Sequence, residues 1–112
     1  MDDTVLLITR NGMGSAEVEL QHRLLTNYLR LLLENGTLPG AICFYTDGVR
    51  LVTEGSPVLE LLRQLEAKGV HLIVCQTCIN YFALADRVRA GVVGGMGDIL
   101  AAQAKAAKVI TL

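Results

Sequence analysis

The sequence lacks the features by which several classes of protein are recognised. It has no tryptophan and only five aromatic residues, and its ten basic residues are spread along the chain without forming a block. Proteins that bind nucleic acid through its phosphates carry a basic patch, so the sequence predicts no nucleic-acid partner. Its longest apolar runs are far shorter than the roughly 20 residues that span a bilayer, so it predicts no membrane partner.

Cysteine is scarce as well, with three residues in the chain: Cys43, Cys75 and Cys78. An odd number of cysteines does not suggest the disulfide framework of a small secreted protein. Residues 1–3 include two aspartates, where a secretory signal would carry positive charge. We therefore expect a cytoplasmic protein whose cysteines are buried, catalytic or metal-binding.

Aliphatic residues are abundant and form short runs that alternate with amphipathic segments. Strands are expected at 4–9, 41–45, 70–74, 90–93 and 109–112, a short extended piece at 49–53, and helices at 17–34, 79–87, 99–107 and between Ser56 and Gly69. This alternation predicts one α/β domain over residues 1–112. It should be a three-layer sandwich, with a mostly parallel five-stranded sheet, helices on both faces and a flavodoxin-like 2-1-3-4-5 strand order.

The helix expected at 17–34 is unusually apolar. Ser15 is a suitable N-cap for it, and Gly36 a suitable stop. Its main apolar stripe contains Val18, Leu25, Tyr28, Leu29 and Leu32, whereas Leu20, Leu24, Leu31 and Leu33 lie off that stripe. A helix that covers a sheet needs only one stripe. The surplus predicts a second packing surface, most simply against another copy of the chain.

Three loops follow expected strands and would meet at one edge of the sheet. In open parallel sheets, ligands bind outside the carboxyl ends of the strands, where residues 10–14, 46–48 and 75–78 lie. In the 2-1-3-4-5 order, Arg10 would lie beside the cysteines. The candidate substrate- or anion-binding residues are Arg10, Asn11, Gly12, Gly14, Asp47, Gly48, Gln76 and Thr77.

Cys75 and Cys78 are the candidate catalytic residues, because they form a Cys-x-x-Cys pair between a strand and a helix. A thiolate forms when positive charge or a helix N-terminus lowers the thiol pKa from about 8.5. The helix dipole would activate Cys78, and backbone N–H groups with Arg10 would activate Cys75. Either residue could instead be a buried, inert cysteine, and Cys43, in the middle of a strand, is expected to be one.

Two other uses of a Cys-x-x-Cys pair fit the sequence less well. Thioredoxin-type oxidoreductases place a proline against the motif from later in the chain, but Pro39 and Pro57 both precede it. A zinc site usually needs four ligands, and neither His22 nor His71 obviously converges on the pair. Apart from a metal shared between subunits, which stays open, the sequence predicts no metal and no cofactor.

The glycine-rich loops invite a nucleotide-binding interpretation. Gly12 and Gly14 follow a strand and precede a helix, as in the dinucleotide fingerprint, but Glu17 occupies the position of its third glycine. Residues 94–97 could form an anion-binding nest, although a tight turn explains the same glycines. Nucleotide binding is therefore disfavoured.

Residues 69–82, which contain both cysteines of the pair, resemble the cysteine segment of DsrE/DsrF-like proteins. Residues 38–49 and 92–96 extend the resemblance over essentially the whole chain, which is most similar to the DsrE-like domain of the YedF selenium-metabolism proteins. The resemblance implies a cytoplasmic sulfur-relay fold that assembles into oligomers. It also implies that Cys75 accepts sulfur as a persulfide and that Cys78 is a resolving or assisting thiol.

The resulting hypothesis is a sulfur, or selenium, carrier in which Cys75 passes sulfur to a partner thiol. Its expected partners are sulfur donor and acceptor proteins and further copies of the chain, as a dimer, trimer or hexamer. YedF proteins usually carry another domain with a Cys-Pro motif, which would be the natural exchange partner. This sequence has no Cys-Pro dipeptide, so a stand-alone relative and an excised domain are both open. The alternative function is a non-catalytic oligomeric binding or scaffold module with structural cysteines.

Overall fold

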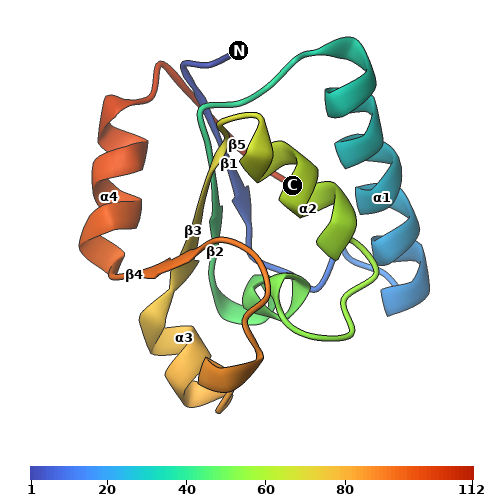
Figure 1. Cartoon of the computed structure of the whole chain (residues 1–112), viewed down its shortest axis with the longest axis vertical. Helices are drawn as coiled ribbons and strands as arrows, with labels where there is room; N and C mark the ends of the chain where they lie inside the picture. The colour runs from blue at the N-terminus through green and yellow to red at the C-terminus, as the bar shows by residue number, and fades with distance from the viewer.

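A five-stranded sheet forms the centre of the computed structural model, which describes residues 1–112 (Figure 1). All its strands are parallel and lie in the order β4-β3-β2-β1-β5. The strands are β1 (Thr4–Ile8), β2 (Ala41–Phe44), β3 (His71–Cys75), β4 (Val92–Gly94) and β5 (Lys108–Thr111). Every residue of β1 and β2 is buried, which explains why these strands are nearly continuous apolar runs.

Helices cover both faces of the sheet, which confirms the predicted α/β sandwich (Figure 1). The helices are α1 (Val18–Asn35), α2 (Leu59–Ala67), α3 (Gln76–Tyr81) and α4 (Met96–Lys105), with two 3-10 helices, η1 (Thr46–Val52) and η2 (Ala85–Arg87). Helices α1 and α2 pack together on one face, α4 lies on the opposite face, and α3 projects from the carboxyl edge. None of the helices has both the length and the apolar character that crossing a bilayer demands.

The strand order differs from the predicted 2-1-3-4-5 order. Strands β1, β2 and β3 lie side by side in chain order, because the crossovers through α1 and α2 run over the same face and have the same hand. The chain changes face only after β4, where α4 leads back to β5 on the far side of β1. Strand β2 therefore separates the ends of β1 and β3, and this separation decides which predicted site residues meet.

Two segments at the carboxyl edge also differ from prediction. Residues 49–53, expected to be extended, mostly belong to η1, whose apolar side chains are buried. The helix expected at 79–87 is divided, because α3 starts directly after Cys75 and the chain turns at Ala83, whose φ is +55°. This earlier start places Cys78 inside a helix.

The ends of α1 and α4 show which capping signals the chain uses. Glu17, not Ser15, precedes α1 and makes no side-chain cap, whereas Gly36 ends that helix in the left-handed conformation as predicted. Helix α4 starts earlier than predicted, at Met96. Asp98 supports this start from within the helix, because its Oδ2 accepts the N–H of Gly95 at 2.9 Å.

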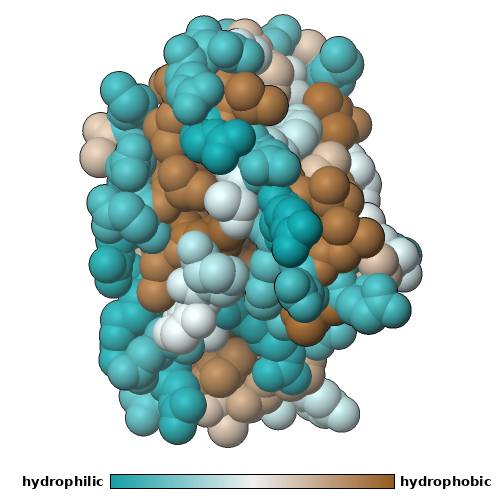
Figure 2. All heavy atoms as spheres, turned by 90° about the vertical axis from the view of Figure 1, so that its right-hand side faces the viewer, coloured by the Kyte–Doolittle hydropathy of each residue, from teal (hydrophilic) through white to brown (hydrophobic).

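Helix α1 exposes more apolar surface than a helix that merely covers a sheet. Leu25, Leu29 and Leu32 face the core, while four large apolar residues off that stripe are 42–48% exposed: Val18, Leu20, Leu24 and Leu31. Figure 2, which faces the α1 side, shows hydrophobic residues among hydrophilic ones on this surface. The predicted surplus is present, although Val18 lies on the exposed side instead of the core stripe.

Candidate functional site

Cys75 lies where the sheet meets α3. It is the last residue of β3, pairs with Gly94 of β4 and occupies the N-cap position of α3. Strand β3 is mostly apolar and contributes to the protein core, and Cys75 at its end is only 1% exposed. The structure therefore places this thiol at the carboxyl edge, as the sequence predicts, but closed off from solvent.

Cys78, in the first turn of α3, is half-buried and opens onto the surface. It lines a pocket of about 280 Å³ whose walls come from η1 and α3. The lining residues are Thr46, Asp47, Thr77, Cys78, Tyr81 and Phe82. Of the predicted site residues, Asp47 and Thr77 thus meet Cys78 as expected. The pocket therefore gives Cys78 access to the surface.

One hydrogen bond fixes the sulfur of Cys78: the backbone N–H of Thr46 donates to Cys78 Sγ at 3.1 Å. The thiol of Cys75 is its neighbour and lies close enough to influence its pKa. Thr46 has a φ of +51°, an unusual value for a β-branched residue, and its hydroxyl donates to the carbonyl oxygen of Thr9. The strained turn at the end of β2 therefore aims a backbone donor at the sulfur.

The electrostatics of Cys78 differ from the sequence prediction. Burial raises the pKa of its thiol above the ordinary value, the N–H of Thr46 acts in the opposite direction, and the neighbouring Cys75 raises the pKa further. The predicted lowering is wrong because desolvation outweighs the single backbone donor that faces the sulfur. Cys43, fully buried in β2, has a pKa raised by burial to about 11, so it stays a neutral thiol at physiological pH.

The loop after β1 lies apart from the cysteines. Asn11 Oδ1 is 3.3 Å from His22 Nε2, and the carbonyl oxygen of Gly14 accepts a hydrogen bond from Gln21 Nε2 at 3.0 Å. Gly12 lies directly against Gln21, and the side chain of Arg10 neither lines the Cys78 pocket nor bonds to either thiol. The 2-1-3-4-5 order that would place Arg10 beside the cysteines is wrong, because β2 lies between β1 and β3.

The remaining predicted site residues, Gly48 and Gln76, contact other parts of the fold and do not line the Cys78 pocket. Gly48 is buried against the carbonyl oxygen of Ile8, where a Cβ atom would lie 2.0 Å away. Gln76 is exposed, and its Nε2 donates to Asn80 Oδ1 at 3.3 Å. Neither residue lines the pocket. His71, at the opposite end of β3, is also remote from the cysteine pair, so it cannot complete a metal site with it.

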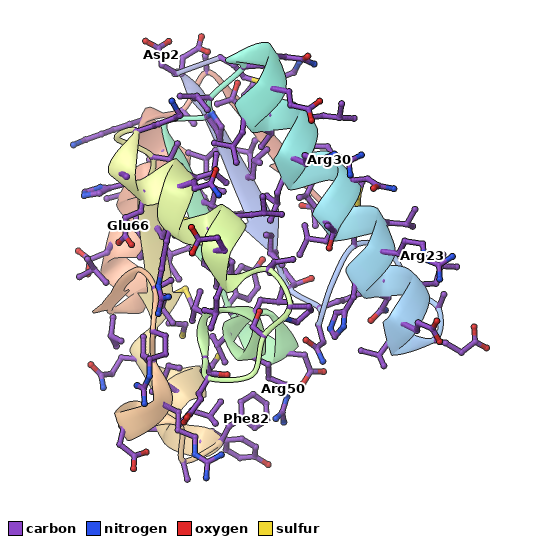
Figure 3. The ribbon with its side chains drawn as sticks, turned by 45° about the vertical axis from the view of Figure 1, so that its right-hand side comes forward. Asp2, Arg23, Arg30, Arg50, Glu66 and Phe82 are labelled. Atoms are coloured by element: carbon purple, nitrogen blue, oxygen red, sulfur yellow. The ribbon has the colours of Figure 1, made fainter.

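Sequence reasoning missed an aromatic and cationic group beside the pocket. The guanidinium carbon of Arg50 lies 4.2 Å from the centroid of the Phe82 ring, and Arg50 Nε donates to Asp47 Oδ1 at 3.1 Å (Figure 3). Tyr81, 84% exposed, packs edge-to-face on Phe82. No local signal marked Arg50, because it lies in the segment expected to be extended.

Solved structures share this fold. The YchN protein from E. coli superposes with a TM-score of 0.72 at 18% identity over 100% of both chains. MTH1491 from Methanobacterium thermoautotrophicum gives 0.71 at 20% identity over 97% of both chains, and BT1422 from Bacteroides thetaiotaomicron gives 0.65 at 17% identity over 98% of this chain and 95% of the other. At these identities, the likeness is one of fold alone.

Sequence comparison identifies the family. No curated protein matches the sequence. However, residues 5–112 match the profile of the DsrE/DsrF-like family, a group generally made up of sulfur-relay proteins. The match includes the sheet, all the helices and the cysteine pair. The chain therefore belongs to the DsrE/DsrF-like family.

Proposed function

We propose that this protein carries sulfur as a persulfide on Cys75 and exchanges it with donor and acceptor proteins. The observation that carries the proposal is the pair of neighbouring free thiols, Cys75 and Cys78, at the carboxyl edge of the sheet. One thiol is enclosed, which protects a labile persulfide from solvent, and the other opens onto a pocket. Family membership supports the same class of chemistry.

Each transfer is a thiol exchange. The acceptor thiolate attacks the outer sulfur atom of the donor persulfide, the donor's sulfur–sulfur bond breaks, and its electron pair leaves with the donor thiolate. The outer sulfur keeps its oxidation state, so no oxidant or reductant is consumed. A small domain with a Cys-Pro motif, of the kind fused in YedF proteins, is one partner class that this reaction accommodates.

Mass spectrometry tests the carrier function directly. The protein is incubated with a cysteine desulfurase and cysteine, and fragment ions locate any added sulfur. We expect one sulfur atom on Cys75 in the wild type and in the matched control Cys43→Ser, but none at position 75 in Cys75→Ser. A wild type that gains no sulfur on either Cys75 or Cys78 would refute the proposal.

The resemblance to YedF proteins extends the proposal to selenium and to the cytoplasm. Selenium and sulfur form analogous bonds to a thiolate, so a persulfide carrier also suits selenium as cargo. Replacing cysteine with selenocysteine as the source, with a lyase that accepts it, tests whether Cys75 gains selenium. Reduced thiols persist in the cytoplasm, which is the compartment we propose.

The exposed face of α1 supports assembly of the chain with copies of itself. Leu20, Leu24 and Leu31 remain exposed there although each could contribute apolar burial. We propose a homo-oligomer, and sedimentation of the wild type against Leu24→Lys tests it: the variant should sediment as a smaller species. A monomeric wild type would contradict it.

The same face favours one other function, a scaffold module in which the cysteines are structural. The two functions predict different thiol chemistry. If the scaffold function is correct, none of the three cysteines should gain sulfur from a persulfide donor. If the carrier function is correct, Cys78 should react with such a donor, because it opens onto the pocket.

A further inference from the structure

The two thiols of the pair differ sharply in access. Cys75 is 1% exposed, so a cysteine on another protein cannot approach its sulfur in this conformation. Cys78 lines a pocket that is open to solvent, and its thiol neighbours that of Cys75, which lies close enough to raise its pKa. Of the two thiols, the one that faces the surface is therefore that of Cys78.

We propose that Cys78 is the gate of the carrier: it takes sulfur from the donor at the surface, passes it inward to Cys75 and receives it back for delivery. This inference rests on the proposed carrier function and adds an obligatory order to it. Cys78 is then a catalytic residue in its own right, since it bonds to the transferred atom. The sequence suggests that Cys78 is a resolving or assisting thiol. In this proposal its role is specific: it transfers sulfur between the partner protein and Cys75.

The inward transfer occurs in two balanced exchanges. The Cys78 thiolate first attacks the outer sulfur of the donor persulfide, so that a Cys78 persulfide forms and the donor thiolate leaves. The Cys75 thiolate then attacks the same sulfur, its bond to Cys78 breaks, and the electron pair returns to Cys78. The proton released by Cys75 passes to its neighbour Cys78. Delivery to an acceptor follows the reverse path.

The surroundings of Cys78 suit a sulfur atom that gains negative charge twice in each cycle. The N–H of Thr46 points at Cys78 Sγ from 3.1 Å, and it stabilises the thiolate both when Cys78 attacks and when it leaves. Thr77 and Phe82 line the pocket beside this sulfur. The pocket, of about 280 Å³, leaves room for a donor persulfide above Cys78.

Time-resolved loading by cysteine desulfurase tests the gate. In the wild type, sulfur should appear on Cys78 before it appears on Cys75. Cys75→Ser should accumulate sulfur on Cys78 at the wild-type initial rate, and Cys78→Ser should load Cys75 at least about tenfold more slowly. Cys43→Ser is the control and should behave as the wild type.

Inorganic polysulfide separates loss of the gate from loss of the fold. This small donor should load Cys75 in both Cys78→Ser and Cys78→Ala, which would show that Cys75 remains competent in these variants. Loading of Cys75 by the desulfurase at the wild-type rate in Cys78→Ser would overturn the gate and leave the carrier function intact. A Cys75–Cys78 disulfide with released sulfide would overturn it as well. Absence of sulfur on both cysteines of the wild type would overturn the carrier function itself.

Discussion

The loop after β1 and the segment after β3 leave the same edge of the sheet, yet they use their polar atoms in opposite ways. In the first, Asn11 and Gly14 bond to side chains of α1, so the loop's hydrogen-bonding groups are consumed within the fold. In the second, Cys78 accepts a single backbone hydrogen bond, from Thr46, and remains open to a pocket. Position at the functional edge is therefore not sufficient for a role in the site. The role of each segment depends on the residues that pack against it, and β2 lies between the loop after β1 and the segment after β3.

The largest expected effect tests whether the β1 loop is structural. Gly12 has a φ of +146°, and a Cβ atom there would lie 2.4 Å from Gln21 Cβ. Gly12→Ala should therefore lower the free energy of unfolding by about 2–4 kcal/mol, measured by urea denaturation. The alkylation rate of Cys78 in the folded fraction should stay unchanged.

Gly14→Ala is the matched control for this change. Gly14 also has a positive φ, +75°, but nothing lies within 4 Å of the position of a Cβ atom. The substitution should lower the free energy of unfolding by only about 1 kcal/mol, the backbone contribution. Equal losses in the two variants would show that contact with Gln21 does not anchor the loop.

The strand between the two regions provides a pH-dependent test. Burial raises the pKa of Cys43 from 9.0 to about 11, so the folded state holds the thiol proton more tightly than the unfolded state does. The resulting contribution to stability is complete below about pH 9 and is lost as the pH rises towards about 11, by up to about 3 kcal/mol. Urea denaturation across this range should show the loss in the wild type.

Cys43→Ala isolates this contribution from the lysines and tyrosines that titrate at similar pH. The variant should lose less stability than the wild type between about pH 9 and pH 11, whatever its stability at neutral pH. Identical pH dependence in the two proteins would mean that Cys43 is not enclosed by β1 and β3. The barrier between the two regions would then be looser than the structure indicates.

A smaller effect is expected in the segment after β3, where the hydrogen bond from Thr46 to Cys78 can be tested. Thr46→Val removes the hydroxyl group that donates to Thr9 and loosens the turn that aims the N–H at Cys78 Sγ. Alkylation of Cys78 near pH 8 should slow about threefold, because the thiolate loses its donor. The rate profile against pH should shift upward accordingly.

Thr46→Ser retains the hydroxyl group and should restore the wild-type alkylation profile. A purely structural role for Thr46 would change the unfolding midpoint and leave the pH profile of Cys78 in place. Measuring both quantities on the same samples therefore separates positioning of the sulfur from general stability. Equal pH profiles for Thr46→Val and the wild type would show that the hydroxyl group of Thr46 does not position the N–H that faces Cys78 Sγ.

The sequence predicts the local part of this arrangement well. The apolar run that ends at Cys75 and the helix that follows are encoded by neighbouring residues, and so is the proximity of Asp47 and Thr77 to the edge. The order of the strands is not encoded by neighbouring residues, because it depends on which face of the sheet α1 and α2 cross. That choice is a property of the whole sheet. The φ of Thr46 and the stacking of Arg50 on Phe82 also arise from contacts between distant segments.

The smallest expected effect is the sharpest test of the separation, because the sequence predicts the opposite. The sequence predicts that Arg10 lies beside the cysteines and helps to activate Cys75, but β2 lies between its loop and β3, and Arg10 does not line the Cys78 pocket. Exposed charges at such separations are screened by water and salt, so Arg10→Ala should change the alkylation rate of Cys78 by less than about twofold. Arg50→Ala is the comparison, since Arg50 contacts Phe82 at the pocket wall and should have the larger effect. A larger change in Arg10→Ala than in Arg50→Ala would mean that the β1 loop reaches the cysteines after all, and that the two regions form one site.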